Sequence, residues 1–286
     1  MKSIIKKKTK LLLFFTLAMA ACSKDSIDSP NDNIIQSKYV TKLFAYVPAP
    51  GQFINDPSYG TEEAAKSILG KNDGIVSLGA YGGYIILGFD HPIVNRKDRS
   101  DLAIYGNAQA SFAEPGIVWV MQDENNNGLP DDTWYELKGS EYEKDGYIKN
   151  YEVTYFRPKK MEEEISWKDN KGASGTLKIN THHKQTYFPQ WIKEDSYTLS
   201  GSLLPNTNIN ANTPNLVASL PFEWGYADNL EARNDIDIDN AVDENGEKAS
   251  LQTINFIKIQ TGILADLGQL GEFSTEIASV EDLSIQ

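Results

Sequence analysis

GIVWVMQDENNNGLPDDTWYELKG, residues 116–139, is the stretch that decides the fold class. Its two ends, GIVWVM (116–121) and TWYELKG (133–139), are rich in β-branched and aromatic residues, which favour strands. The segment between them is rich in Asn, Asp, Gly and Pro, which favour turns. Two such runs joined by a turn predict neighbouring strands of an antiparallel sheet.

Runs of the same kind, separated by turn-forming residues, fill most of the chain. In YEVTYF (151–156) large side chains alternate with others, as expected of a strand with one face in water. Only TEEAAKSIL (61–69) predicts a helix, because Thr61 suits its N-terminal cap and Gly70 its end. We therefore predict an all-β, two-sheet jelly roll with one short helix. The remaining strand-like runs span residues 40–47, 74–79, 84–89, 101–106, 175–179, 196–201 and 254–262.

The N-terminus has the features of an export signal. MKSIIKKKTK carries five lysines, and a short apolar run leads to Ala20, Ala21 and Cys22. A basic start, a short apolar core and small residues before a cut site are typical of a signal peptide. Cys22, the only cysteine, stands where a bacterial lipobox places its lipidated residue. We predict a lipoprotein signal peptide over 1–21, with a plain secretory peptide cut after Ala20 or Ala21 as the alternative.

The rest of the chain divides into a tether and one domain. Residues 22–37 are rich in Ser, Asp and Asn and predict a flexible tether, and 38–286 predict a single β-sandwich domain. Loss of the five leader lysines changes the formal charge from −13 to −18. So acidic a chain repels nucleic acid and anionic membrane, and we expect contact with a membrane only through the lipid.

An aspartate-rich loop between the two opening strands predicts a calcium site. Oxygen-bearing side chains alternate along it and a glycine allows a sharp turn, as in the first part of a calcium loop. Trp134 occupies the place of the bidentate glutamate of an EF-hand, and the flanks are strands. The alternative is an ordinary hairpin turn. The candidate ligands are Asp123, Asn125, Asn127, Asp131 and Asp132.

A second acidic stretch is DIDIDN (235–240). Its aspartates, Asp235, Asp237 and Asp239, would share one face of a strand, with the intervening isoleucines facing the core. Mutual repulsion of three carboxylates favours a bound cation. A solvated edge strand, protected by charge from pairing with another sheet, is the slightly favoured interpretation.

Aromatic side chains in polar loops predict a ligand surface. Trp191 lies in YFPQWIKED, and Trp224, Tyr226 and Asp228 lie in PFEWGYADN. Flat rings beside acids and amides suit stacking on a sugar or another ring-shaped ligand, although such rings are equally common in sandwich cores. The sequence contains no GxSxG, HExxH or cysteine-based catalytic motif, and the neighbouring His182 and His183 would point to opposite faces of a strand. A pair of acids working as in a glycosidase stays open.

Several motifs resemble a family of Bacteroidota lipoproteins described as cell surface proteins, and the core pattern is also similar to jelly rolls of PEP-CTERM-type exported proteins. The resemblance spans about residues 40–282. The motifs are SLGAYGGYIILGFDHPI (77–93), DLAIYGNA (101–108), EPGIVWVMQDENNNGLPDDTWYELKGSEY (114–142), WGYADN (224–229), FIKIQTG (256–262) and LGEFSTEI (270–277).

The resemblance implies a galactose-binding-like or jelly-roll sandwich and carries the calcium role to Asp123 through Asp132. Relatives accompany TonB-dependent uptake systems, some of them for cobalamin. This implies a lipoprotein of the outer membrane that faces the cell exterior and captures a cobalamin-like corrinoid or a glycan for import. The alternatives are a carboxylate-dependent glycan hydrolase or lyase, and a structural or adhesive surface protein.

Overall fold

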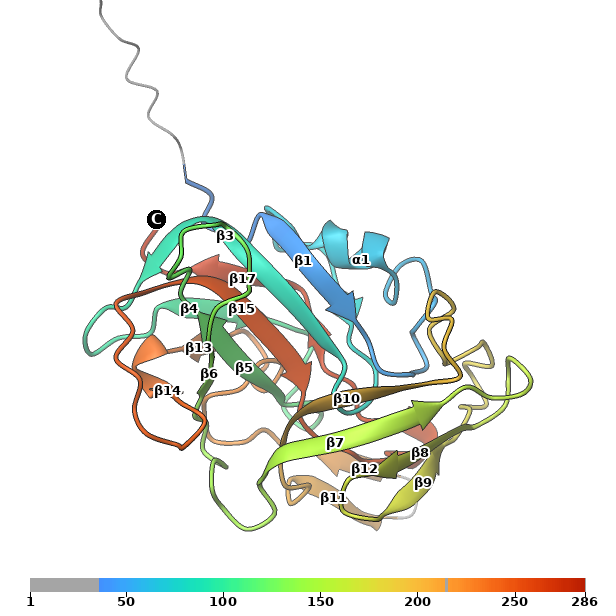
Figure 1. Ribbon diagram of the computed structural model, residues 1–286. Helices are drawn as coiled ribbons and strands as arrows, with labels where there is room; N and C mark the ends of the chain where they lie inside the picture. Colours follow the sequence, from blue (N-terminus) through green and yellow to red (C-terminus); the bar gives the residue numbers. More distant parts are fainter. Residues whose placement is uncertain (1–35, 214–215, 286) are drawn as a thin grey trace, which may run out of the picture. The chain divides into compact units, whose positions relative to one another are not determined.

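The central sheet contains six strands, and each pair of neighbours is antiparallel (Figure 1). Strand β15, from the C-terminal part of the chain, lies between β3 and β5 and pairs with both. In order across the sheet the strands are β1 (Lys42–Val47), β3 (Tyr84–Val94), β15 (Thr253–Thr261), β5 (Gly116–Met121), β6 (Trp134–Leu137) and β14 (Ala241–Val242). The computed structural model describes residues 36–213 and 216–285.

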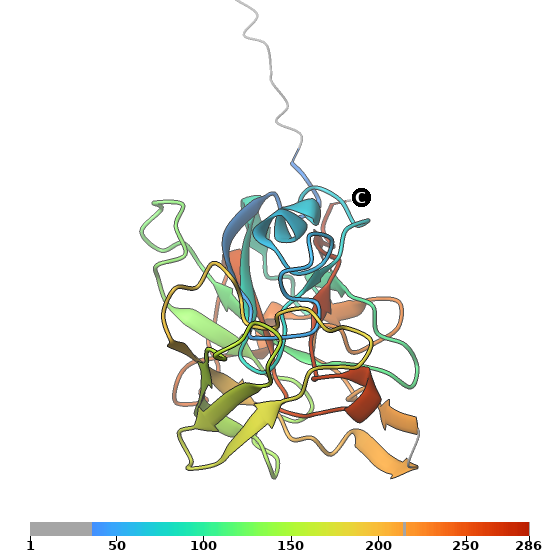
Figure 2. The ribbon, with the colours of Figure 1, turned by 90° about the vertical axis from the view of Figure 1, so that its right-hand side faces the viewer.

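A second antiparallel sheet has the order β10 (Ser196–Leu203), β7 (Ile148–Phe156), β8 (Ile165–Asp169) and β9 (Ser174–Leu177). Smaller sheets complete the domain. They are β13 (Asn234–Ile236), β4 (Leu102–Tyr105) and β17 (Ser279–Asp282); β16 (Glu276–Ile277) with β2 (Val76–Ser77); and the hairpin of β11 (Ile209–Thr213) and β12 (Leu216–Ser219). That hairpin lies at the end of the domain opposite to the helix α1 (Glu62–Ser67) (Figures 1 and 2). The predicted all-β, sandwich-like fold is confirmed.

The helix α1 (Glu62–Ser67) lies inside the predicted range 61–69. Thr61 is its N-cap, and the Thr61 hydroxyl accepts a hydrogen bond from the backbone N–H of Ala64 at 3.2 Å. Ala64 and Ala65 are buried against the core. Within the described residues, no helix is long and apolar enough to span a membrane.

The two faces of the central sheet meet different surroundings. Ile257 and Ile259 of β15 belong to the main hydrophobic core, together with Val118 of β5. Gln260 lies on the other face, where its amide Nε2 donates to Ser200 O of β10 and to Gly82 O, both at 2.9 Å. Gly201 makes this approach possible, since a Cβ there would lie 1.9 Å from Gln260 Oε1. Gln260 thus ties the second sheet to the first.

The predicted strand over 235–240 is wrong beyond Ile236. Asp237 accepts a hydrogen bond from the N–H of Asp239 and thereby caps a short 3₁₀ helix, η1 (Ile238–Asn240). Ile236 and Ile238 are buried as expected. Two of the aspartates face basic partners, Asp235 at 2.8 Å from Arg233 and Asp239 at 3.2 Å from Lys248. These ion pairs relieve the repulsion that the sequence pattern suggested.

The predicted signal peptide, Cys22 and the predicted tether up to Ile35 lie outside the described residues. Lipidation of Cys22 therefore stays a prediction. From Gln36 onward the chain forms one compact unit.

The central position of β15 gives a prediction about stability. Replacing Ile259, which is fully buried, by Ala should lower the free energy of unfolding by about 2–5 kcal/mol, because it leaves a cavity in the core. Val94→Ala on β3, where the side chain is 53% exposed, should change it by less than about 0.5 kcal/mol. Urea unfolding measures both. Equal effects would show that this face of β15 is not the core.

Candidate ligand-binding site

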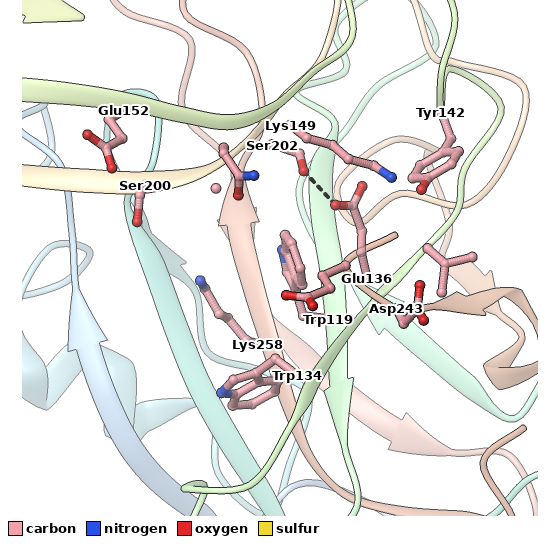
Figure 3. Close-up of a pocket in the computed structure, with 14 residues that line it drawn as sticks. Trp119, Trp134, Glu136, Tyr142, Lys149, Glu152, Ser200, Ser202, Asp243 and Lys258 are labelled. Carbon is pink, nitrogen blue, oxygen red and sulfur yellow. Dashed lines mark hydrogen bonds between the residues drawn. The ribbon is translucent and has the colours of Figure 1, made fainter. Parts of the chain in front are cut away.

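A row of three unlike side chains crosses the face of the central sheet that is turned toward the second sheet. Lys258 of β15 is paired with Trp119 of β5, and Trp119 is paired with Glu136 of β6. Because paired residues point to the same side of a sheet, the three side chains share one face. Figure 3 shows them in one cavity, with Trp119 between the lysine and the glutamate.

The second sheet and two loops form the other walls of this cavity, which has a volume of about 350 Å³. We call it the tryptophan cavity. Trp134 adds a second indole ring at the start of β6 (Figure 3). The remaining walls carry polar and charged groups from β7, β10 and the loops after β6 and β14. They include Tyr142, Lys149, Asn150, Glu152, Ser200, Ser202, Asp243 and Glu244.

Glu136 is held firmly in place. Its Oε2 accepts a hydrogen bond from the Ser202 hydroxyl at 2.5 Å, and its Oε1 accepts one from the Tyr147 hydroxyl at 2.8 Å. Burial raises the pKa of the Glu136 carboxyl, while these two hydrogen bonds and the positive charges of Lys149 and Lys258 oppose the rise. The result is a fixed hydrogen-bond acceptor in the cavity.

The two lysines of the cavity differ in their surroundings. Lys258 Nζ lies over the ring of Tyr84 at 4.7 Å from its centroid and over that of Trp119 at 5.4 Å. Burial lowers the pKa of Lys258 to about 8, against the opposing charge of Glu136. Lys149 Nζ lies 3.6 Å from Glu143 Oε1 and 4.9 Å from the centroid of Tyr142. Only the second lysine therefore has a carboxylate partner.

This combination suits a small polar ligand with a ring. The faces of indole rings offer apolar area for stacking, and hydroxyl, amide and carboxylate groups can fix the orientation of ligand hydroxyls. The cavity volume lies at the lower end of the usual range for small-molecule sites, about 300–1,000 Å³. A single sugar ring meets these demands.

A second cavity, of about 450 Å³, lies elsewhere in the domain and contains Glu114 and Glu276. These two carboxyls and that of Asp228 are buried, and oxygens of all three lie within 4.8 Å of one another. Burial raises the pKa of Glu276 to about 8 and that of Asp228 to about 7. Burial and the two neighbouring acids together raise the pKa of Glu114 well above its usual value. We call these residues the acid triad.

Hydrogen bonds within the fold account for much of the acid triad. Asp228 Oδ1 accepts from the N–H groups of Asn107 and Ala108 at 3.0 and 2.9 Å, and its Oδ2 accepts from the N–H of Glu276 at 2.9 Å. Asp228, predicted from sequence as a ligand-binding residue, is fully buried and joins three segments of chain. The Ser274 hydroxyl donates to Glu276 Oε1 at 2.8 Å.

The other predicted ligand-binding residues lie outside the tryptophan cavity. Trp191 is 42% exposed and lies near Tyr46, with ring centroids 6.2 Å apart. Trp224 and Tyr226 line a hollow of about 150 Å³ that does not include Trp191. The Tyr226 ring is buried, and its hydroxyl accepts a hydrogen bond from the N–H of Glu141. The structure thus joins two of these three rings and separates the third.

Sequence reasoning missed the residues of the tryptophan cavity, although one signal was present. Lys258 interrupts the apolar strand INFIKIQTG, where a charged residue is unexpected unless it serves a site. His182 and His183 line the second cavity but are not members of the acid triad.

The five predicted calcium ligands lie together in the loop between β5 and β6. Asp123 Oδ1 and Oδ2 accept from the N–H groups of Asn127 and Gly128 at 3.1 and 2.9 Å. Asn127 Nδ2 donates to both carboxylate oxygens of Asp131, and Asn125 Nδ2 donates to Asp132 Oδ1 at 3.2 Å. Gly128 has a φ of 73°, so the loop needs a glycine at this position.

Comparison with known proteins adds no family. No protein-family model matches the chain, and no curated protein is significantly similar to it. The interpretation of the site therefore rests on its own geometry.

The acid triad gives a prediction about pH. The unfolded chain releases these protons near pH 4, whereas the folded protein keeps them to about pH 7–8, so the folded state binds more protons in between. The free energy of unfolding should therefore fall as pH rises from about 5 to about 8. Glu276→Gln, which is permanently neutral, should make this fall shallower. Urea unfolding at several pH values measures it, and an unchanged slope in the variant would contradict the assignment.

Proposed function

We propose that this protein is a surface lipoprotein that captures a glycan, with one sugar ring bound in the tryptophan cavity. The observation that carries the proposal is the meeting of two indole rings, Trp119 and Trp134, with fixed polar groups in one hollow. Trp119 belongs to the main sheet and Trp134 begins the next strand, so rigid elements rather than loops present both rings.

The size of the cavity favours a glycan over a corrinoid. A cavity of about 350 Å³ encloses one sugar ring. A cobalamin-like corrinoid, with its macrocycle and nucleotide loop, is several times larger than a sugar ring and would remain mostly outside. A titration with cobalamin therefore distinguishes corrinoid binding from glycan binding.

Capture is also favoured over hydrolysis at this cavity. Both oxygens of Glu136, its only deeply buried acid, already accept hydrogen bonds from Ser202 and Tyr147. Glu152 and Glu244 are exposed. A general acid or base must exchange a proton with the substrate. A carboxylate whose two oxygens are both engaged is better suited to accept hydrogen bonds from ligand hydroxyls.

The proposed cellular role combines this cavity with the N-terminal sequence. A lipid on Cys22 would hold the domain at the outer membrane, on the exterior side, where a TonB-dependent transporter imports what the domain captures. Support comes from the sequence features of residues 1–22 and from the resemblance of the motifs. An adhesive or structural role would instead require a protein partner.

Titration calorimetry with matched tryptophan variants tests ligand capture. The purified protein should bind at least one member of a panel of monosaccharides and oligosaccharides. Trp134→Ala should weaken that binding about fivefold or more, since stacking on an aromatic face contributes roughly 1 kcal/mol or more. Trp191→Ala removes a 42% exposed ring outside the cavity and should leave affinity unchanged.

Two results would contradict the proposal. One is no binding of any glycan, with or without binding of cobalamin. The other is equal loss of affinity in both tryptophan variants, which would place the sugar elsewhere. Release of new reducing ends from the oligosaccharides would favour the hydrolase alternative.

We further propose that the loop from Asp123 to Asp132 binds a structural calcium ion. Calcium takes six to eight oxygen ligands, and the five candidate ligands of this loop bring three carboxylates and two amide side chains together within ten residues. Hydrogen bonds already bring these side chains together, so that modest rotations of the amide groups of Asn125 and Asn127 would turn oxygens inward.

Removal of calcium tests this site. A chelator should lower the melting temperature of the protein, because an ion bound only by the folded state stabilises it. Asp123→Ala should abolish this response to chelator. Asp243→Ala is the matched control, since Asp243 also accepts backbone N–H bonds in an exposed turn, at 2.9 Å from Asn245 and Glu247. An Asp123 variant that still responds to chelator would exclude this loop.

A further inference from the structure

We propose that Lys258 makes the tryptophan cavity selective for an acidic sugar, whose carboxylate it binds. This inference rests on the proposed capture of a glycan and specifies its chemical class. Lys258 Nζ has three donors, and no hydrogen bond or ion pair joins it to a residue within 36–213 and 216–285. Its described neighbours are the aromatic faces of Tyr84 and Trp119.

The Lys258 ammonium has no anionic partner within the described residues, and a ligand can supply one. Lys258 is partly buried, and partial removal of a charge from water without hydrogen bonds in return is costly, because aromatic faces offset only part of the lost hydration. A ligand carboxylate would accept charge-assisted hydrogen bonds from Lys258, which are about twice as strong as neutral ones. The indole nitrogen Nε1 of Trp119 is buried and has no hydrogen-bond partner among the described residues.

Glu136 does not occupy this position, although it is the nearest buried acid. Lys258 and Glu136 are separated by the strand that carries Trp119. Neighbouring strands lie about 4.8 Å apart, so the backbones at the two positions are about 10 Å apart. In Figure 3 the two charged groups lie on opposite sides of the Trp119 ring. A ligand carboxylate beside Lys258 therefore need not approach Glu136.

The other charged groups that line the cavity are exposed or already engaged. Glu152 and Glu244 are exposed, so water screens their charges. Asp243 accepts hydrogen bonds from its own turn. Lys149 has Glu143 as its partner at 3.6 Å. Lys258 is thus the cation of the cavity that is most available to an anionic group.

The arrangement divides recognition of one sugar between two kinds of contact. The ring stacks on an indole face, its hydroxyls reach Glu136 and the serine hydroxyls, and its carboxylate meets Lys258. Neutral sugars make the first two contacts only. The protein should therefore bind a hexuronate more tightly than the matching hexose.

Calorimetry with matched pairs of sugars tests the inference. The pairs are glucose with glucuronate, galactose with galacturonate, and mannose with mannuronate, each as the methyl glycoside. At pH 7 the uronate of at least one pair should bind about tenfold more tightly than its hexose, as expected for a hydrogen bond to a charged group. Above pH 8 this preference should shrink, because Lys258 then loses its proton.

Two lysine variants identify the residue responsible. Lys258→Met keeps the length of the side chain without its charge, and it should bind both sugars of the pair equally. Lys168→Met is the matched control, because Lys168 Nζ also lies over an aromatic ring, at 5.4 Å from the centroid of Phe156, but outside the cavity; this variant should retain the preference for the uronate. Binding of the hexose by Lys258→Met would show that the variant is folded and its cavity intact.

The outcomes separate this inference from the proposed function. If hexoses bind but no uronate binds more tightly, or if Lys258→Met keeps the preference, selection by Lys258 is overturned while glycan capture stands. If no hexose or uronate of any pair binds, and the wider glycan panel is silent too, both proposals are overturned.

Discussion

The hydrogen-bond ladder on both sides of β15 is the constraint on which the rest of the domain depends. This strand comes from near the C-terminus, yet it lies between β3 and β5 and joins segments far apart in the sequence. Its alternation then assigns the two faces of the sheet. Ile257 and Ile259 face the main core, while Lys258 and Gln260 face the second sheet. One strand therefore organises the core, the contact between the sheets and the cavity.

The placement of Lys258 follows from that alternation and has a cost. Lys258 is only partly exposed, because the second sheet, tied by Gln260 to β10, lies across from this face of the central strand. The fold surrounds the ammonium with the rings of Tyr84 and Trp119 instead of a carboxylate. Titratable groups whose pKa is shifted by burial cluster at functional sites. The acid triad differs from Lys258 because it has partners in the fold. Asp228 links three segments of the chain by accepting hydrogen bonds from backbone N–H groups.

Local pattern in the sequence predicted the strands well and the site poorly, for a physical reason. Runs such as GIVWVM carry their own strand signal, and Thr61 marks the start of the only α-helix among the described residues. The tryptophan cavity, in contrast, is made by pairing between β15, β5 and β6 and by the approach of β10, and no local pattern encodes that register. In the 235–240 stretch the local pattern itself misled. The regular alternation of Asp and Ile predicted a strand, but the Asp237 side chain caps a short 3₁₀ helix instead. The grouping of the five candidate calcium ligands could be predicted because all of them are neighbours in sequence.

The central claim is that a sugar binds between the two indole rings and Lys258. A crystal structure of the protein with a bound hexuronate tests this most directly. The sugar ring should lie against Trp134 or Trp119, with its carboxylate within hydrogen-bond distance of Lys258 Nζ. A sugar found instead beside Trp191, or in the hollow of Trp224 and Tyr226, would contradict the account.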